Sequence, residues 1–259
     1  MSETKNTLIV REVKKSFGGV LACNGPSLEA STGKIHAIIG PNGAGKTTLI
    51  NLISGVYPPD AGQVLLNGED ITHTRSSQIA QKGIARTFQN VALFRGMSVL
   101  ENMMLGRNYH MKAGVVSCGI FWGRARREEA EQRRKVEDVI DFLGLSDIRK
   151  TPVSGLPLGL QKRVELGRAL VAEPKVLLLD EPMGGMNLEE KESMARFVLD
   201  VTEHTSTAVI LIEHDMGVIM DISDHIIVMD QGSVIAEGTP SEVQANPRVI
   251  EAYLGGHAA

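Results

Sequence analysis

The chain has 259 residues, of which 27 are basic and 31 acidic, so its formal net charge is −4. A slightly acidic chain is not typical of a dedicated nucleic-acid binder, which usually presents a basic surface. Cys23 and Cys118 are too few for a disulfide framework or a zinc site, and a reducing compartment is the simplest expectation. Segment 1–7 lacks the order of a signal peptide, and no apolar run is long enough to span a bilayer.

The first third of the chain predicts strands around one glycine-rich loop. Leu8–Val13 reads as a first strand, and the apolar run at 35–39 reads as a buried strand that ends in glycine. A helix is expected from Thr47 to Ser54. The loop between that strand and that helix consists of Gly40, Pro41, Asn42, Gly43, Ala44, Gly45, Lys46, Thr47 and Thr48.

This loop matches the phosphate-binding pattern G-x-x-x-x-G-K-[ST] in the strand–loop–helix context that the pattern requires. Its backbone N–H groups and the helix N-terminus favour an anion, and Gly43 and Gly45 let the backbone approach it closely. Lys46 is expected to reach the β- and γ-phosphates, and the Thr47 hydroxyl to bind Mg²⁺. The loop therefore predicts a nucleoside triphosphate site.

The chain after the loop first continues the strand-rich pattern and then becomes helical. Asn67-Gly68, between two short strand-like runs, predicts a tight hairpin. A helix over 76–82, closed by Gly83, precedes a strand at Ile84–Phe88. Ser98 and Glu101 form a capping box that opens a helix through Leu105.

Two further helices are expected in this part, over 124–143 and 159–172. The first has Val136, Val139, Ile140 and Leu143 on one face and Gly144 as its stop. Its charges, with Glu129–Arg133 and Glu131–Lys135 at i,i+4 spacing, indicate a solvated face.

Strands and helices alternate in the last third, which predicts a parallel sheet covered on both faces. The expected strands are 175–180, 207–212, 225–229 and 234–237, and the expected helices are 188–203 and 215–222. Ser241 is expected to open a C-terminal helical segment.

Two carboxylates follow the most apolar strand. Val176–Leu179 delivers Asp180 and Glu181 to the carboxyl end of the sheet, where parallel sheets place ligands. Asp180 is expected to hold Mg²⁺, and Glu181 to polarise a water toward the γ-phosphate. Three single polar residues also follow core strands and carry little information alone: Gln89, expected at Mg²⁺ or the water, Asn187, expected at the nucleotide, and His214, expected at the γ-phosphate.

The joint order of these features resembles the ATP-binding subunit of ABC transporters. It comprises the phosphate loop, Gln89, a helical insertion, the run 163–170, the carboxylate pair, Asn187 and His214. The resemblance extends over about Leu8 to Leu254. Finer features resemble the branched-chain amino acid importer branch: Arg86–Asn90, Leu93-Phe94, Ser98–Asn102, Gly185–Asn187, Ile212–Met216 and Asn246–Gly255.

This resemblance implies an α/β P-loop NTPase fold, with a RecA-like parallel-sheet core, an antiparallel β subdomain and an inserted α-helical subdomain. It implies a single domain over 8–254, with core segments 8–89 and 164–240, helical subdomain 90–163 and C-terminal helical segment 241–254. The implied ligands are ATP and Mg²⁺, with Phe17 stacked on adenine. Phe94, Met97 and Val99 are expected to line a groove that receives a helix of the membrane subunit.

The implied partners are a second, related ATPase subunit, two membrane permease subunits and, indirectly, a solute-binding protein, with no nucleic acid. The implied location is the cytoplasmic face of the plasma membrane. In such pairs, each phosphate loop faces the signature segment of the other subunit.

The signature segment of this chain departs from the family pattern Leu-Ser-Gly-Gly-Gln. It falls on Leu156–Leu160, where Pro157 offers neither a hydroxyl nor an N–H, and Gly159 remains for phosphate. Losing one charge-assisted contact costs roughly 1.5–3 kcal/mol. We therefore expect an asymmetric pair, in which this chain's phosphate loop meets an intact signature on a different partner subunit; a homodimer is the alternative.

Other functions stay open at this point. The chain could serve another ABC system, such as lipid or lipopolysaccharide export, or a non-transport ABC ATPase of DNA repair or translation. The latter usually carry two cassettes or long coiled coils, and neither is expected from these 259 residues. No Asn-Lys-x-Asp motif occurs, which argues against a GTPase. Amides, urea and aromatic acids are as compatible with the chain as branched-chain amino acids.

Overall fold

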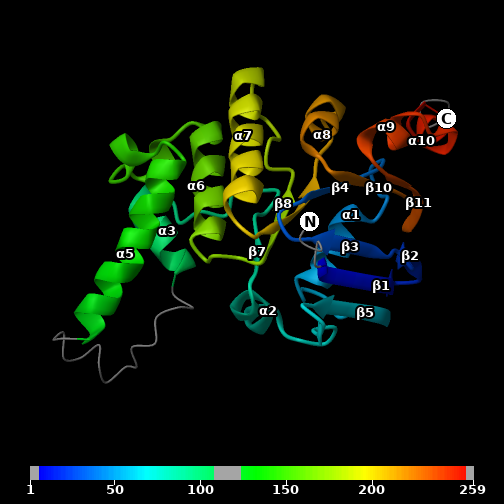
Figure 1. The fold of residues 1–259 in the computed structure, drawn as a ribbon, viewed down its shortest axis with the longest axis horizontal. Helices are drawn as coiled ribbons and strands as arrows, with labels where there is room; N and C mark the ends of the chain where they lie inside the picture. Colours follow the sequence, from blue (N-terminus) through cyan, green and yellow to red (C-terminus); the bar gives the residue numbers. More distant parts are fainter. Residues whose placement is uncertain (1–5, 108–123, 255–259) are drawn as a thin grey trace.

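A computed structural model describes residues 6–107 and 124–254 (Figure 1). Two sheets and a set of helices make up this part of the chain. The predictions for 106–123 beyond residue 107, including Cys118 and the apolar run to Trp122, lie outside the described residues.

The first sheet is antiparallel and is built on the long strand β1 (Asn6–Phe17). It runs in the order β2-β1-β5-β6, and β3 pairs with the N-terminal part of β1. The remaining strands are β2 (Val20–Asn24), β3 (Leu28–Ser31), β5 (Ala61–Leu66) and β6 (Glu69–Asp70). The predicted hairpin is confirmed, since Leu66 pairs with Glu69 across Asn67 and Gly68, both of which have positive φ. The strands β2 and β3 were not predicted, because segment 17–33 carries no sustained apolar run.

The second sheet is parallel except at one edge and has the order β11-β10-β4-β9-β8-β7. Its strands are β4 (Ile35–Ile39), β7 (Ile84–Arg86), β8 (Val176–Asp180), β9 (Ala208–Ile212), β10 (His225–Asp230) and β11 (Ser233–Gly238). Every residue of β4, β8 and β9 is buried, as expected for central strands covered on both faces. The strand predicted for 84–88 is shorter, because β7 leaves the sheet after Arg86.

The predicted helices are present, with ends shifted by one or two residues. They are α1 (Lys46–Ile53), α2 (Ser76–Lys82), α3 (Val99–Gly106), α5 (Arg124–Phe142), α6 (Leu158–Leu170), α7 (Leu188–His204), α8 (Met216–Ile222), α9 (Pro240–Gln244) and α10 (Pro247–Leu254). The capping box of Ser98 and Glu101 and the left-handed closure at Gly83 are confirmed. The C-terminal segment opens at Thr239, not Ser241, because the Thr239 side chain caps α9. No described helix combines the length and the apolar character needed to cross a bilayer.

The two faces of the second sheet pack against different partners. Alternate residues of β8 and β9 point to opposite sides: Leu178 and Ile210 join a core with α1 and the first sheet, whereas Leu177 and Leu211 join a core with α6 and α7. In Figure 1 the first sheet lies at one end of the molecule, and α3, α5 and α6 gather at the other.

The helical part corrects two details of the sequence analysis. Val99 is fully buried, so it does not line a surface groove, whereas Phe94 and Met97 are exposed. Lys135 reaches Glu173 at 2.8 Å instead of Glu131, because α5 packs beside the turn that follows α6. The apolar face of α5 is confirmed, with Val136, Ile140 and Leu143 buried and Val139 partly buried.

Candidate active site

The phosphate loop joins β4 to α1 and depends on glycine at two positions. Gly45 is the N-cap of α1 with φ 95°, and a Cβ there would collide with the carbonyl oxygen of Ala22. Gly40 has φ 148°, and a Cβ there would collide with the carbonyl oxygen of Met229. Both residues adopt a backbone that L side chains disfavour, so the loop conformation is specific to this glycine pattern.

Lys46 is buried, and its ammonium donates to the carbonyl oxygens of Gly40 (2.7 Å) and Pro41 (3.0 Å). Burial lowers the pKa of Lys46, and the nearby carboxylates of Glu181 and Asp180 partly offset this effect. Phosphate oxygens are stronger acceptors than neutral carbonyls, so an anionic ligand can replace these carbonyl oxygens as hydrogen-bond partners of the ammonium.

A cavity of about 590 Å³ lies over the loop. Its lining contains Asn42 to Thr48 of the loop together with Gln89, Glu181 and His214, which sequence analysis assigned to one site. Residues 20–22 and Gln231 complete the wall. The parallel topology explains this convergence, because β7, β8 and β9 all end at the same edge of the sheet.

The Glu181 carboxylate is held by the two other predicted catalytic side chains. His214 Nε2 lies 2.8 Å from Oε1, and the Gln89 amide donates to Oε2 at 3.1 Å. Glu181 has φ 51°, an unusual value for a residue with a side chain, and such strain concentrates at functional sites. The three side chains therefore form one constellation at the mouth of the phosphate loop.

Asp180 is almost fully buried and binds Arg86 through one oxygen, Oδ2, at 2.8 Å. Its other oxygen, Oδ1, has no hydrogen-bond partner among the described residues. An unpaired buried carboxylate oxygen is costly, and a hard cation or its water would satisfy it. Arg86 also donates to Asn51 on α1, at 2.6 Å, so it connects the carboxylate to the helix behind the phosphate loop.

Five residues predicted to bind the nucleotide lie outside the lining of this cavity: Gly40 and Pro41 at the start of the phosphate loop, and Phe17, Gly159 and Asn187 in other parts of the chain. Phe17 is half exposed and packs edge-on against Tyr57, with ring centroids 5.2 Å apart. The Asn187 side chain accepts from the Glu190 N–H at 2.9 Å and caps α7. Gly159 packs against the Glu190 side chain. Their contacts with nucleotide therefore stay predictions.

The N-terminus of α6 carries the altered signature segment. Pro157 is its N-cap and makes no side-chain cap, and Leu158 is exposed. A second cavity, of about 710 Å³, extends from this terminus to Gln89 and Glu181.

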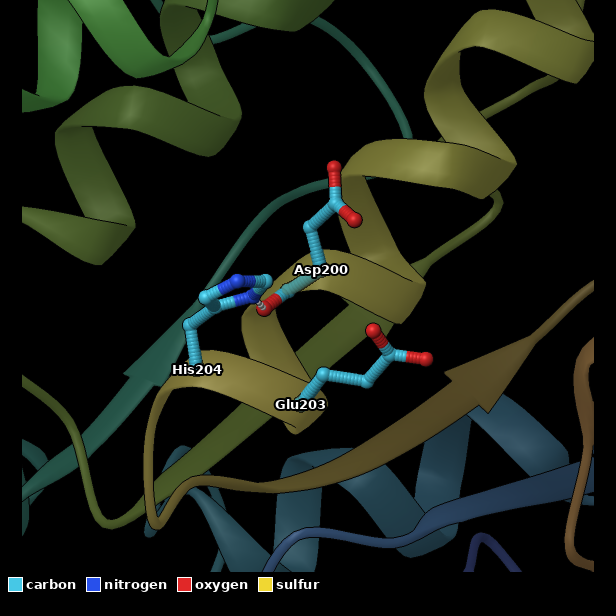
Figure 2. Close-up of side chains that lie close together, drawn as sticks. All are labelled: Asp200, Glu203 and His204. Carbon is cyan, nitrogen blue, oxygen red and sulfur yellow. Dashed lines mark hydrogen bonds between the residues drawn. The ribbon is translucent and has the colours of Figure 1, made fainter.

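One group of potential metal-ligating side chains among the described residues lies elsewhere, at the C-terminal end of α7 (Figure 2). Asp200, Glu203 and His204 place ligand atoms within 4.8 Å of one another, and Glu203 and His204 are exposed. The His204 ring contacts the Asp200 carbonyl at 3.0 Å, which accounts for its position without an ion.

Comparison with known proteins bears on this site directly. Residues 23–184 match the sequence profile of the ABC transporter family, and residues 233–259 match that of the branched-chain amino acid ATP-binding cassette transporters. The chain belongs to the ABC transporter ATP-binding family. The match over 23–184 spans the phosphate loop, Gln89 and the carboxylate pair, and as a member of this family the chain binds nucleotide.

Relatives of this ABC protein cover nearly its whole length. It is 40% identical to the high-affinity branched-chain amino acid transport ATP-binding protein LivG of Salmonella typhimurium, over 96% of this chain and 97% of that protein. Identity to BraF of Pseudomonas aeruginosa, which has the same description, is 39% over 92% and 94%. The crystal structure of an ATP-binding cassette of an ABC transporter in its ADP conformation superposes with a TM-score of 0.85, at 33% identity, over 97% and 100%. These likenesses confirm the predicted P-loop NTPase fold.

Sequence analysis missed Arg86 as a partner of Asp180. Arg86 was quoted only within a stretch that resembles one branch of the family. A lone arginine after a strand carries no spacing signal, so only the fold could place it beside the carboxylate.

Proposed function

We propose that this chain is the ATP-hydrolysing subunit of an importer for branched-chain amino acids or closely related solutes. The Glu181 carboxylate, held by His214 and Gln89 at the mouth of the phosphate loop, is the observation that carries the hydrolytic activity. The descriptions of the relatives, at 39–40% identity over nearly the full chain, support the solute class.

In the proposed reaction, Lys46 and the loop N–H groups bind the phosphates, and Glu181 orients and polarises the attacking water. His214 and Gln89 keep the carboxylate in place and contact the γ-phosphate and the water. Asp180, Thr47 and Gln89 would hold Mg²⁺, which supplies charge neutralisation at the phosphates. Asp180 Oδ1, which has no partner within the described segments 6–107 and 124–254, fits this assignment.

The assembly that we propose contains a second ATPase subunit, two permease subunits and, through them, a solute-binding protein. The chain would then lie at the cytoplasmic face of the membrane through its permease contacts. We also propose the division into a core (8–89 and 164–240), a helical subdomain (90–163) and a C-terminal segment (241–254).

Glu181→Gln tests the catalytic assignment. The variant should bind a fluorescent ATP analogue normally and lose about 10²–10⁴-fold in hydrolysis, because an amide cannot act as a general base. The matched control is Glu189→Gln, which removes an exposed carboxylate from the first turn of α7. Full hydrolysis by Glu181→Gln would overturn the assignment.

Uptake into proteoliposomes tests the solute class. The chain, reconstituted with its permease and binding-protein partners, should drive ATP-dependent uptake of labelled leucine, isoleucine and valine. Urea, short amides and aromatic acids serve as competitors. Uptake of one of these compounds in place of leucine would show that the solute is not a branched-chain amino acid. Export of lipid would show that the system is an exporter and not an importer.

A further inference from the structure

Three charged side chains line one face of α6 at positions 162, 165 and 168, and all three contact the segments that carry Glu181 or Gln89. Lys162 and Glu165 are buried, with exposed fractions of 7% and 3%. Lysine and glutamate are almost never this buried unless they are paired.

The buried ammonium of Lys162 binds the backbone of Glu181, the proposed catalytic residue. Its Nζ donates to the Glu181 carbonyl oxygen at 2.7 Å. No described carboxylate lies within salt-bridge distance of it, and burial lowers its pKa, an effect that Glu213, Glu165 and Glu181 partly offset. An aliphatic side chain at position 162 would be buried at a lower desolvation cost than an ammonium. The cost of burying Lys162 is therefore best explained by a role for its hydrogen bond to Glu181.

That hydrogen bond acts on a strained peptide. Glu181 has φ 51°, and its N–H donates to the Ile212 carbonyl at 2.9 Å. Its carbonyl also accepts from Gly184, at 3.2 Å. A left-handed backbone persists only where the surroundings fix it, and here Lys162 is the side chain that fixes the carbonyl.

Glu165 holds the segment around Gln89 from the next turn of α6. Its Oε1 accepts from the backbone N–H groups of Phe88 (3.4 Å) and Ala92 (3.3 Å), on either side of Gln89. Arg168 donates to the Ala92 carbonyl at 2.6 Å and lies 3.8 Å from Glu165. The helix α6 therefore binds two segments, the one that carries Gln89 and the one that carries Glu181. The side chains of these two residues form a hydrogen bond with each other.

We infer that Lys162 and Glu165 are positioning residues of the hydrolytic site, and that α6 sets the alignment of Glu181 with Gln89. Because α6 begins at the signature segment, a displacement of its N-terminus would shift Lys162 and Glu165. Through their hydrogen bonds, the Glu181 peptide and the Gln89 segment would then move together. This inference rests on the proposed catalytic role of Glu181 and adds to it a mechanical connection from the helical part of the chain.

Lys162→Met is the first test, since it keeps an unbranched apolar chain up to the ε position and removes the donor. We expect kcat for ATP to fall 10- to 100-fold, the equivalent of one charge-assisted hydrogen bond, with nucleotide affinity unchanged within twofold. Lys162→Arg should recover part of the rate. Lys135→Met is the matched control, because it removes a partly exposed lysine of α5 that pairs with Glu173, away from the site. If Lys162→Met does not fold, Lys162→Gln shortens the donor and answers the same question.

A double-mutant cycle separates positioning from general loss of structure. In single-turnover hydrolysis, Lys162→Met should add no further loss to Glu181→Gln, because the residue acts through that carboxylate. Likewise, Glu165→Met should add none to Gln89→Ala.

Wild-type kcat in Lys162→Met, or losses that simply add in the cycle, would overturn the inference and leave the function intact. If Glu181→Gln itself hydrolyses ATP normally, the proposed function and the inference fall together.

Discussion

Two helix N-termini face the catalytic edge of this molecule, and they are built very differently. The N-terminus of α1 has Gly45 as its N-cap, glycines in left-handed conformations and a buried lysine at its first position. The N-terminus of α6 has Pro157 as its N-cap, no side-chain cap, and an exposed leucine at its first position. Both ends carry a partial positive charge, yet only the first has the glycines and the cation of an anion site.

This difference indicates which terminus binds phosphate without help. At α1, the backbone approach and the ammonium are both supplied by this chain. At α6, the family position that offers a serine hydroxyl is occupied by proline, so only backbone N–H groups and the helix dipole remain. The difference between the two termini supports an asymmetric pair of ATPase subunits.

Gly45→Ala should give the largest effect. The new Cβ meets the Ala22 backbone oxygen at φ 95°, so we expect a loss of roughly 3 kcal/mol in the free energy of unfolding and at least about 100-fold in nucleotide affinity. Urea unfolding and titration with a fluorescent ATP analogue measure the two. For the unfolding measurement Gly43→Ala is the matched control: φ is 82°, but nothing lies within 4 Å of the new Cβ, so only the backbone strain of about 1–2 kcal/mol applies. Equal losses in the free energy of unfolding at both positions would contradict the close contact between Gly45 and the Ala22 carbonyl.

Lys46→Met should come next, with a loss of about 100-fold in nucleotide affinity from one or two charge-assisted hydrogen bonds. The melting temperature should stay level or rise, because the variant no longer buries an ammonium that is held only by carbonyl oxygens. Lys82→Met, which removes a partly exposed partner of Glu69, is the control. Parallel loss of folding and binding would mean that Lys46 is structural and not a phosphate ligand.

Pro157→Ser should have a smaller effect, and it tests the α6 terminus directly. If that terminus serves a weak site, the serine hydroxyl should raise ATPase activity of the assembled transporter by about 10-fold, within the range of one charge-assisted contact. Pro157→Ala restores the N–H without the hydroxyl and separates the two contributions. An ATPase rate that stays unchanged in both variants would remove the basis for the asymmetric pair.

Much of this comparison could be predicted from sequence, because its signals are local. The phosphate loop, the capping box at Ser98 and the apolar strand before Asp180 each depend on residues a few positions apart, where turn and strand chemistry act. The strands β2 and β3 lack such signals. In β2 only Cys23 is buried, so its pairing with β1 and not its own pattern creates the strand.

The positioning residues could not be found in this way. Lys162 bonds a carbonyl 19 residues away, and Glu165 bonds Ala92, which is 73 residues away. Within α6, these charges at i,i+3 spacing look like an ordinary solvated face, and only the packing of α6 against the sheet edge makes them buried. Long-range placement of a charge is set by topology, which composition and periodicity do not encode.

Gly159→Ala should have the smallest effect if the two termini differ as described. Its Cβ would meet the Glu190 carboxylate, the far end of a flexible side chain, and the cost of displacing Glu190 from its cap should nearly offset the gain in helix propensity. We expect a change within about 1 kcal/mol in urea unfolding and less than about 3-fold in hydrolysis. Gly167→Ala is the control in the same helix, where the Cβ collides with Met103 in the core and should cost about 1–3 kcal/mol. A 100-fold loss of hydrolysis in a stable Gly159→Ala would instead mean that phosphate approaches this backbone as closely as it approaches Gly45, and the two termini would then be equivalent.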